Sequence, residues 1–585
     1  MTTLSAKERR DALEAQYPVW PRHTMSAHFE EQAKRFADRP LLITEDAAHT
    51  YGEIWEKGKV YARALMGLGV RRREHVAVLM ASEVEYTYLM LGIWLVGAVC
   101  VPINTMLLDE ELLYLLRQSD SRWLFMHQVA SGVVHSDTVS RVYDDIVAKD
   151  QAPVGIAQVV CLANTDAPLD PRFLAWDDFL QKAELVTEEE RLARTAASDY
   201  PDEVADIIYT SGSTGLPKGV MITHDMFLRC GYSTALSRAF EEGRRVFTAL
   251  PLYHVFALVE GILAVSFVGG ALIIAPRFTP QLSLQIMEKH RANDFLCVPS
   301  MLVALLNHAD LSAYDLSALY AMMCAAAPAP IVIWERAIQE MGLREICAGY
   351  GGTEATASTA HTEVGDAIET VATRVGRIKP GGVSGLPEFG GANIQYKTID
   401  PFTQEDLDPG DIGELVVRGN HVTKGYYNKP DETAAVIDKD GWLRTGDLGR
   451  MHEGGYIELL GRSKELYKIS GENVAPKEVE DVISRHPAVA QAYVIGVKDV
   501  MTSETGAAFI ELRAGATCTR RELIDYCQER LARFKVPRYF WFMETDQWPM
   551  TGTGKIQKFR LQEIAEKRLL ERGSGTSALE VATSN

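Results

Sequence analysis

YTSGSTGLPKGV, residues 209–220, is a loop dense in Gly, Ser and Thr that ends in a lysine. Gly212 and Gly215 can adopt backbone angles that are closed to other residues, so successive N–H groups can turn toward an anion. Hydroxyl donors and a positive charge come from Ser211, Ser213, Thr214 and Lys218. The stretch predicts a loop that wraps the phosphates of a nucleotide.

This loop departs from the Walker A motif, which requires G-x-x-x-x-G-K-[ST]. Pro217 precedes the lysine and Gly219 follows it, so the last glycine and the magnesium-ligating hydroxyl of that motif are both missing. A P-loop kinase or GTPase is therefore disfavoured. From these residues alone, the alternative is a flexible surface turn rich in small residues.

The sequence around the loop predicts an α/β fold. Short β-branched runs alternate with longer amphipathic stretches, as in parallel strands joined by helices. These runs lie at residues 76–80, 123–126, 159–162, 205–209 and 271–274. Because the run at 205–209 leads directly into the Gly-rich loop, we expect the nucleotide at the end of a strand of an open α/β sheet.

Length and composition limit the classes of function. A chain of 585 residues predicts several domains. The formal net charge of −19 argues against nucleic acid and anionic membranes as partners and favours a small molecule. Eight cysteines without a C-x-x-C pair, and a charged N-terminus unlike a signal peptide, predict a reduced cytoplasmic protein without a zinc ribbon.

The composition changes near residue 461. Beyond it, segments 478–486, 493–497, 509–512 and 521–534 predict a compact module of helices and strands. The tail is small and polar, which predicts disorder. We therefore expect domains at 1–461 and 462–572, followed by a disordered tail at 573–585.

Further strings follow the phosphate loop in order. They are LPLYH (250–254), GYGGTEA (349–355), GELVVRG (413–419), KGYYNKPDET (424–433), GWLRTGDLG (441–449), GRSKELYKISGENVAPKEVE (461–480), FKVPR (534–538) and PMTGTGKIQK (549–558). Over nearly its whole length the chain resembles the adenylate-forming superfamily of acyl-CoA synthetases, peptide-synthetase adenylation domains and luciferases. The resemblance implies a large layered α/β domain that carries the ATP and acyl sites, and a small mobile α+β lid domain.

The family's chemistry implies that a small carboxylic acid attacks the α-phosphate of ATP, giving acyl-AMP and pyrophosphate, before a thiol captures the acyl group. The cofactors implied are ATP, Mg²⁺ and coenzyme A. By resemblance, Lys555 is the catalytic lysine and Glu354 the magnesium-associated glutamate. Thr353 would touch the α-phosphate, and His254 matches a gating histidine near the acyl carboxylate.

The resemblance also implies an ATP site. In it, Tyr350 packs on adenine and Asp447 accepts both ribose hydroxyls. Its members would be Thr210, Ser211, Gly212, Ser213, Thr214, Gly215, Lys218, Gly349, Tyr350, Gly351, Thr353, Asp447 and Arg462.

A hinge and a thioester face belong to the same resemblance. Lys464 corresponds to the hinge about which the small domain turns between half-reactions. After that rotation, Lys468, Ser470, Gly471 and Asn473 would line the coenzyme A channel.

The implied acyl pocket departs from the family pattern. Its residues would be Tyr253, His254, Phe256, Glu260, Ala325, Ala326 and Gly352, and the family often has Met at the last position. Glu260 lies in the apolar run 255–268, where a carboxylate is costly unless paired. Its partner is a structural cation, water, or the cationic end of a substrate.

A basic segment after Glu354 contains Arg374, Arg377 and Lys379. We consider two interpretations, a site for a second carboxylate on the substrate and a solvated loop.

Four functions share these motifs. The leading one is an AMP-forming CoA ligase of the carnitine or crotonobetaine branch or the short or aromatic acyl branch. A standalone adenylation enzyme that loads a carrier-protein thiol is the alternative, and a luciferase-like oxygenase and a non-catalytic ATP-binding regulator are less favoured. No aspartate closely follows His254, unlike in peptide-synthetase domains. The acid and the oligomeric state, with a homodimer among the options, are left open.

Overall fold

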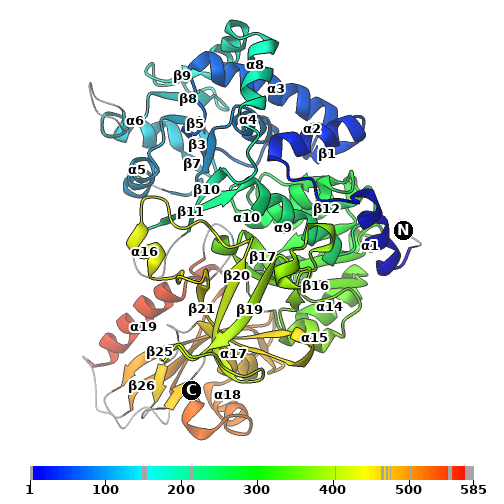
Figure 1. The fold of residues 1–585 in the computed structure, drawn as a ribbon. Helices are drawn as coiled ribbons and strands as arrows, with labels where there is room; N and C mark the ends of the chain where they lie inside the picture. The colour runs from blue at the N-terminus through cyan, green and yellow to red at the C-terminus, as the bar shows by residue number, and fades with distance from the viewer. Residues whose placement is uncertain are drawn as a thin grey trace.

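The computed structural model describes residues 4–107, 109–147, 155–210, 216–327, 329–401, 403–462, 465, 467–469, 472–474, 476–499, 502–550 and 556–573. Figure 1 shows a blue and cyan layer of sheet and helices above a green layer, with an orange and red module below them. The large N-terminal part and the small C-terminal part predicted from the sequence are both present.

The larger central sheet has nine strands in the order β18-β17-β16-β15-β14-β12-β13-β1-β2. Their bounds are β1 Pro40–Ile43, β2 Ala48–Thr50, β12 Arg245–Thr248, β13 Ala271–Ile274, β14 Asp294–Cys297, β15 Ala321–Ala325, β16 Glu345–Gly352, β17 Ala357–His361 and β18 Arg377–Ile378. From β1 to β16 neighbouring strands are parallel. Strands β13, β14 and β15 are buried along their whole length, as expected for parallel strands covered on both faces.

A second sheet has seven strands in the order β11-β10-β4-β3-β5-β8-β9. Their bounds are β3 His75–Leu79, β4 Val99–Pro102, β5 Trp123–His127, β8 Gln158–Leu162, β9 Leu174–Ala175, β10 Val204–Thr210 and β11 Lys218–Thr223. Strand β11 is antiparallel to β10, with Thr210 opposite Lys218. The Gly-rich loop therefore joins two strands of a hairpin at the edge of the sheet, whereas the sequence predicted only the strand that precedes it.

Helices cover both sheets. Those of the large part are α1 Ala6–Gln16, α2 Met25–Arg35, α3 Tyr51–Leu68, α4 Val84–Leu95, α5 Asp109–Gln118, α6 His135–Ile146, α7 Trp176–Gln181, α8 Glu188–Ala196, α9 His224–Ser237, α10 Val255–Ala257, α11 Ala264–Ser266, α12 Pro280–Lys289, α13 Pro299–Leu306, α14 Ile331–Met341, α15 Ile368–Thr373 and α16 Pro430–Ala434. A π-helix, η2 Leu258–Leu263, connects α10 to α11. Every residue of α9 is buried, and the largest core contains side chains from both sheets.

A four-stranded antiparallel sheet, β19-β20-β21-β22, follows in the chain. Its strands are β19 Ile394–Ile399, β20 Ile412–Gly419, β21 Leu443–Met451 and β22 Ile457–Arg462. The register of the last two strands places Asp447 opposite Arg462. One core joins this sheet to Tyr350 of β16, so the sheet is attached to the large part at the predicted nucleotide site.

The C-terminal module has its own sheet and helices. The strands are β23 Tyr467–Ile469, β24 Glu472–Val474, β25 Val489–Asp499, β26 Ser503–Leu512 and β27 Tyr539–Phe542, and the helices are α17 Pro476–Ser484, α18 Arg520–Gln528 and α19 Lys558–Gly573. Two cores consist entirely of residues from Tyr467 onward. Among the described helices, none is long and apolar enough to cross a membrane.

Candidate active site

Strand β16 and the turn after it carry four of the predicted nucleotide-site residues. Gly349, Tyr350 and Gly351 lie in the strand, and Thr353 begins a single 3₁₀ turn, η4 Thr353–Ala355. A Cβ atom on Gly351 would lie 1.9 Å from the carbonyl oxygen of Ala357, so this position requires glycine. The path of the strand past the neighbouring β17 thus depends on the GYGG string.

The predicted adenosine-binding residues come together. Tyr350 donates its hydroxyl to Asp447 Oδ2 at 2.7 Å, and Arg462 Nε lies 2.8 Å from Asp447 Oδ1. The side chain of Asp447 remains 14% exposed. A carboxylate only accepts hydrogen bonds, so the exposed part of Asp447 suits the hydroxyl groups of a ligand.

The phosphate-loop lysine and Glu354 are linked through one tyrosine. Lys218 Nζ lies 4.9 Å from the centre of the Tyr426 ring, and Tyr426 donates its hydroxyl to Glu354 Oε1 at 3.1 Å. Lys218 Nζ also lies 3.2 Å from Glu432 Oε2. The sequence included Tyr426 and Glu432 in the KGYYNKPDET string but assigned no role to either.

The residues available for a metal fit a magnesium ion that ATP helps to bind. Within the described ranges, no group of three or more His, Cys, Asp and Glu side chains is arranged to hold a metal by itself. Glu354 is a single half-buried carboxylate beside the buried Thr353. Because Mg²⁺ commonly takes one or two carboxylates together with substrate phosphates and water, Glu354 suits that kind of ion.

The residues around the predicted gating histidine begin helix α10. His254 Nδ1 accepts the N–H of Phe256 at 3.2 Å and caps the helix. Tyr253 donates its hydroxyl to Asn104 Oδ1 at 3.0 Å, and burial raises the pKa of Tyr253 to about 12. Asn104 is a contact that the sequence analysis missed, because it comes from the segment after β4.

The other predicted acyl-pocket residues lie at strand ends. Ala325 ends β15 opposite Gly349, and Ala326 has a positive φ of 70°. Among the described residues, a Cβ atom on Gly352 would meet one neighbour within 4 Å, Glu354 Oε2 at 3.7 Å. This separation is an ordinary van der Waals contact, so a Cβ atom at this position meets no clash with the described residues.

The surroundings of Glu260 contradict the hypothesis that it pairs with a cationic substrate. Its side chain is fully buried in η2, with Lys379 Nζ 3.6 Å from Oε1. Thr234 Oγ1 donates to Oε2 at 2.7 Å, and the N–H of Ser358 donates to Oε1 at 3.2 Å. Burial would raise the pKa of Glu260, but Lys379, His361 and Ser358 together hold it below its usual range. The hypothesis that a cationic substrate pairs with Glu260 is therefore wrong, because the cation is Lys379.

The basic side chains of the segment that contains Arg374, Arg377 and Lys379 also contact other parts of the protein. Lys379 is buried and donates to Thr234 Oγ1 at 2.8 Å. The guanidinium groups of Arg374 and Arg377 lie over the Tyr456 ring at 5.6 and 4.4 Å. The interpretation of this segment as a site for a second substrate carboxylate is wrong for Lys379, whose charge is already neutralised by Glu260.

Several predicted residues lie outside the described part of the chain. These are Ser211, Gly212, Ser213, Thr214 and Gly215 of the phosphate loop, the hinge Lys464, Ser470, Gly471 and Lys555, together with the side chains of Lys468 and Asn473. Among the described residues of the C-terminal module, Lys558 Nζ lies 2.7 Å from Glu465 Oε2 and 2.9 Å from Glu480 Oε1. The start of α19 is thereby attached to the residue after the predicted hinge.

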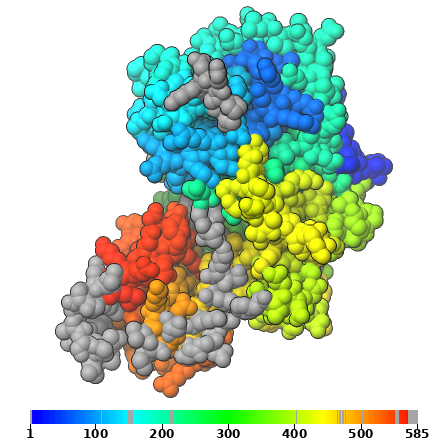
Figure 2. Space-filling view, turned by 60° about the vertical axis from the view of Figure 1, so that its left-hand side comes forward, coloured from blue at the N-terminus to red at the C-terminus, as the bar shows by residue number. Residues whose placement is uncertain are grey.

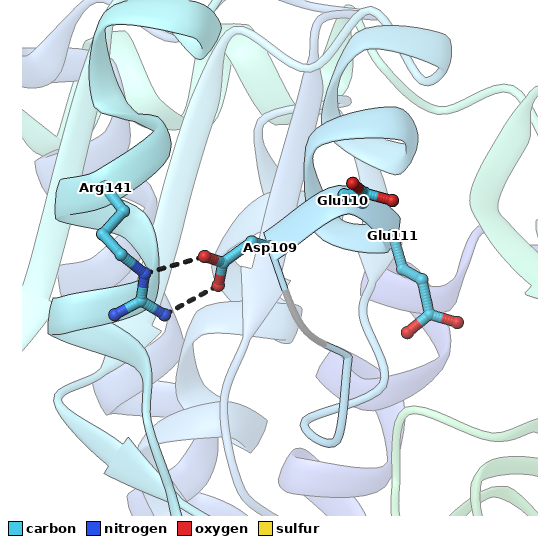
Figure 3. Close-up of a pocket in the computed structure, with 4 residues that line it drawn as sticks. All are labelled: Asp109, Glu110, Glu111 and Arg141. Carbon is cyan, nitrogen blue, oxygen red and sulfur yellow. Dashed lines mark hydrogen bonds and ion pairs between the residues drawn. The ribbon is translucent and has the colours of Figure 1, made fainter.

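One hollow on the surface is lined by residues other than those of the predicted site. Figure 3 shows Asp109, Glu110, Glu111 and Arg141 around it, with Arg141 donating to both oxygens of Asp109 at 2.7 Å. Glu110 and Glu111 point away from that pair. The four residues that line this hollow include none of the predicted site residues.

Comparisons with known proteins identify the family. The family described as AMP-binding enzyme matches residues 29–427, and the AMP-binding enzyme C-terminal domain matches residues 478–555. A relative from Rhodococcus jostii (strain RHA1), named 3-[(3aS,4S,7aS)-7a-methyl-1,5-dioxo-octahydro-1H-inden-4-yl]propanoyl:CoA ligase, is 32% identical over 93% of this chain and 99% of its own.

Two solved structures are similar over most of the chain. The anthranilate CoA ligase AuaEII in complex with anthranoyl-AMP has a TM-score of 0.82 and 25% identity, covering 97% of this chain and 100% of its own. ATP-bound MatB from Rhodopseudomonas palustris has a TM-score of 0.77 and 26% identity, covering 93% of this chain and 99% of its own.

Proposed function

The chain belongs to the AMP-binding enzyme family and is an acyl-CoA synthetase of the adenylate-forming superfamily, and from this premise we propose how its residues divide the two half-reactions. The enzyme activates a carboxylic acid with ATP to acyl-AMP and transfers the acyl group to coenzyme A. One observation carries the assignment. Strand β16 and its turn connect the contact of Tyr350 with Asp447 to the group that contains Glu354 and Lys218.

In the first half-reaction, Tyr350, Asp447 and Arg462 bind the adenosine, with Gly349 and Gly351 forming the adjacent backbone. Lys218, Thr210, Thr353 and residues 211–215 surround the phosphates. Charge that develops on the α-phosphate is stabilised by cations, and we assign Lys555 this role in catalysis. Glu354 would hold Mg²⁺ together with phosphate oxygens, and the ion would supply further neutralisation of charge.

In the second half-reaction, the C-terminal domain rotates at Lys464, so that Lys468, Ser470, Gly471 and Asn473 face the acyl-AMP in place of Lys555. We set the domain boundary at residues 461/462. The two separate C-terminal cores and the attachment of α19 to Glu465 support a module that moves as one body.

The acyl acceptor is coenzyme A, and the similarity to proteins named as CoA ligases favours it over a carrier-protein thiol. Tyr253, His254, Phe256, Ala325, Ala326 and Gly352 line the acyl pocket, and Glu260 supports it from behind. The acid is small, and the cytoplasmic location and a homodimer stay predictions from the sequence.

Pyrophosphate release across a panel of carboxylic acids, with and without coenzyme A, tests this function. We expect pyrophosphate with a subset of acids, and an acyl-CoA product when coenzyme A is added. Pyrophosphate without any acyl-CoA, accompanied by acylation of a carrier protein, would contradict the assignment of the acceptor.

A further inference from the structure

Residues 423–433 form a segment, here called the clasp, that joins the lysine-bearing strand to the turn of Glu354. The N–H of Met221 in β11 donates to the Gly425 carbonyl at 3.1 Å, and the N–H of Tyr427 donates to the Gly219 carbonyl at 2.8 Å. At the start of the clasp, the N–H of Thr423 donates to the Glu354 carbonyl at 2.8 Å. In Figure 2 the yellow region that includes the end of the clasp lies on the surface directly beside the cyan part of the body.

Tyr426 lies at the centre of this arrangement. Its side chain is 7% exposed, its hydroxyl donates to Glu354 Oε1 at 3.1 Å, and Lys218 Nζ lies 4.9 Å from the centre of its ring. The face of an aromatic ring attracts a cation, whereas a phenol hydroxyl donates to an anion. One rigid side chain therefore contacts both the carboxylate and the ammonium group.

The clasp also supplies a counter-charge for Lys218. Glu432 Oε2 lies 3.2 Å from Lys218 Nζ, and Lys429 Nζ lies 2.7 Å from Glu432 Oε1. The hydrogen bond from Lys429 lowers the pKa of Glu432, so this carboxylate is ionised. Lys218 and Lys429 therefore share the Glu432 carboxylate.

We propose that Tyr426 is a positioning residue for adenylation: its hydroxyl orients the Glu354 carboxylate and its ring holds the Lys218 ammonium group, so that this one side chain sets the separation of the two charges. The inference rests on the proposed function, which assigns Glu354 and Lys218 to the nucleotide phosphates and their magnesium ion. Tyr426 acts through these two groups and has no role in the transfer of the acyl group to coenzyme A.

Tyr426→Phe tests the hydroxyl while keeping the ring, and Tyr427→Phe is the matched control. Tyr427 is the next residue and donates its hydroxyl to a different carboxylate, Asp120, at 3.0 Å. The direct measurement is calorimetric binding of α,β-methylene-ATP to the full-length enzyme, with and without Mg²⁺. We expect Mg²⁺ to tighten binding in the wild type and in the control, and this tightening to fall about tenfold in Tyr426→Phe, as for a lost hydrogen bond to a charged group.

Kinetics separate positioning from a general loss of structure. With an acid chosen by the pyrophosphate screen, kcat/KM for ATP should fall about tenfold in Tyr426→Phe, while conversion of supplied acyl-AMP to acyl-CoA stays unchanged. The thermal midpoint should match that of Tyr427→Phe. Equal losses in both half-reactions, together with a lower midpoint than the control, would overturn the proposal.

A double-mutant cycle with Glu354→Gln identifies the partner. If Tyr426 acts through Glu354, the double variant binds the analogue no more weakly than Glu354→Gln alone. Additive losses would overturn the proposal. A weakened Glu354→Gln beside a normal Tyr426→Phe would overturn it and leave the proposed role of Glu354 standing. A normal Glu354→Gln would overturn both the proposal and that role.

Discussion

Lys379→Met should be among the most destabilising single changes in the large domain. The variant keeps the length of the side chain but leaves the Glu260 carboxylate, which is fully buried, without its cation. At the observed separation of 3.6 Å and an effective dielectric constant of about 20, the lost attraction is about 5 kcal/mol. Breaking a buried ion pair from one side costs about 3–5 kcal/mol in measured cases, so we expect a loss of this size.

Urea unfolding followed by tryptophan fluorescence measures this loss as a shift of the transition of the large domain. Lys397→Met is the control, because Lys397 pairs with Asp406 at 2.6 Å at the surface, where the two side chains are 31% and 67% exposed. The control should lose about 1 kcal/mol or less. Replacing both Lys379 and Glu260 by Met should recover most of the loss, since paired apolar groups remove the uncompensated charge.

The pH dependence gives a second test of the same reasoning. The pKa of His361 is lowered to about 4, chiefly by burial and in part by the Lys379 charge, although Glu260 raises it. In Lys379→Met the pKa of His361 should rise, because its Nε2 lies 3.5 Å from Glu260 and a protonated ring replaces the missing cation. The wild-type ring, with its lowered pKa, costs stability as the pH falls below the unfolded value of about 6.5. A higher histidine pKa in the variant reduces this cost, so the variant should be less impaired near about pH 5.5 than near about pH 8. A loss below about 1 kcal/mol that does not change with pH would refute the argument.

Four further outcomes are expected. Gly351→Ala should misfold around the nucleotide site, because its Cβ would meet the Ala357 carbonyl at 1.9 Å, and circular dichroism measures this. Gly352→Met should fold normally by the same measurement and exclude the bulkier acids of the panel. Asp206→Asn should gain stability relative to the wild type as the pH rises above about 4, because burial raises the pKa of the wild-type carboxyl to about 7. Between these pH values the wild type should lose about 1.4 kcal/mol of stability per pH unit through this group. Identical pH profiles of the two proteins in chemical unfolding would contradict this. Lys555→Ala should lower acyl-AMP formation about 10²-fold or more and leave thioester formation from supplied acyl-AMP intact in single-turnover assays; equal losses would exclude a role limited to the first half-reaction.

Local strings predicted much of the fold and the family. A Gly-rich loop, a strand before it and eight further motifs in order were enough to predict the layered α/β body, the small C-terminal module and the enzyme class, all of which are confirmed. The grouping of Tyr350 with Asp447 and Arg462 was also predictable, because each residue lies in its own recognisable motif. Local patterns succeed here because backbone conformation and ligand chemistry both restrict the residues at fixed spacing.

Contacts between distant segments were not predictable in this way. Glu260 was recognised as a buried carboxylate that needed a partner, but its partner lies in a segment that the sequence interpreted as solvated or substrate-binding. The clasp was missed for a related reason. Tyr426 is one of two adjacent tyrosines, and only the pairing of the clasp with β11 determines which of them faces Glu354.

The π-helix η2 lets the chain carry one extra residue beside the proposed acyl pocket. A π turn holds one residue more than an α turn, so loss of a single residue within Leu258–Leu263 would restore regular α geometry. In a regular α-helix such a deletion would rotate everything before it by about 100° relative to everything after it. Here the wide turn absorbs the extra residue, so the flanking segments would keep their orientation. Relatives that are one residue shorter in this helix are therefore expected to place Tyr253 and Phe256 as this chain does.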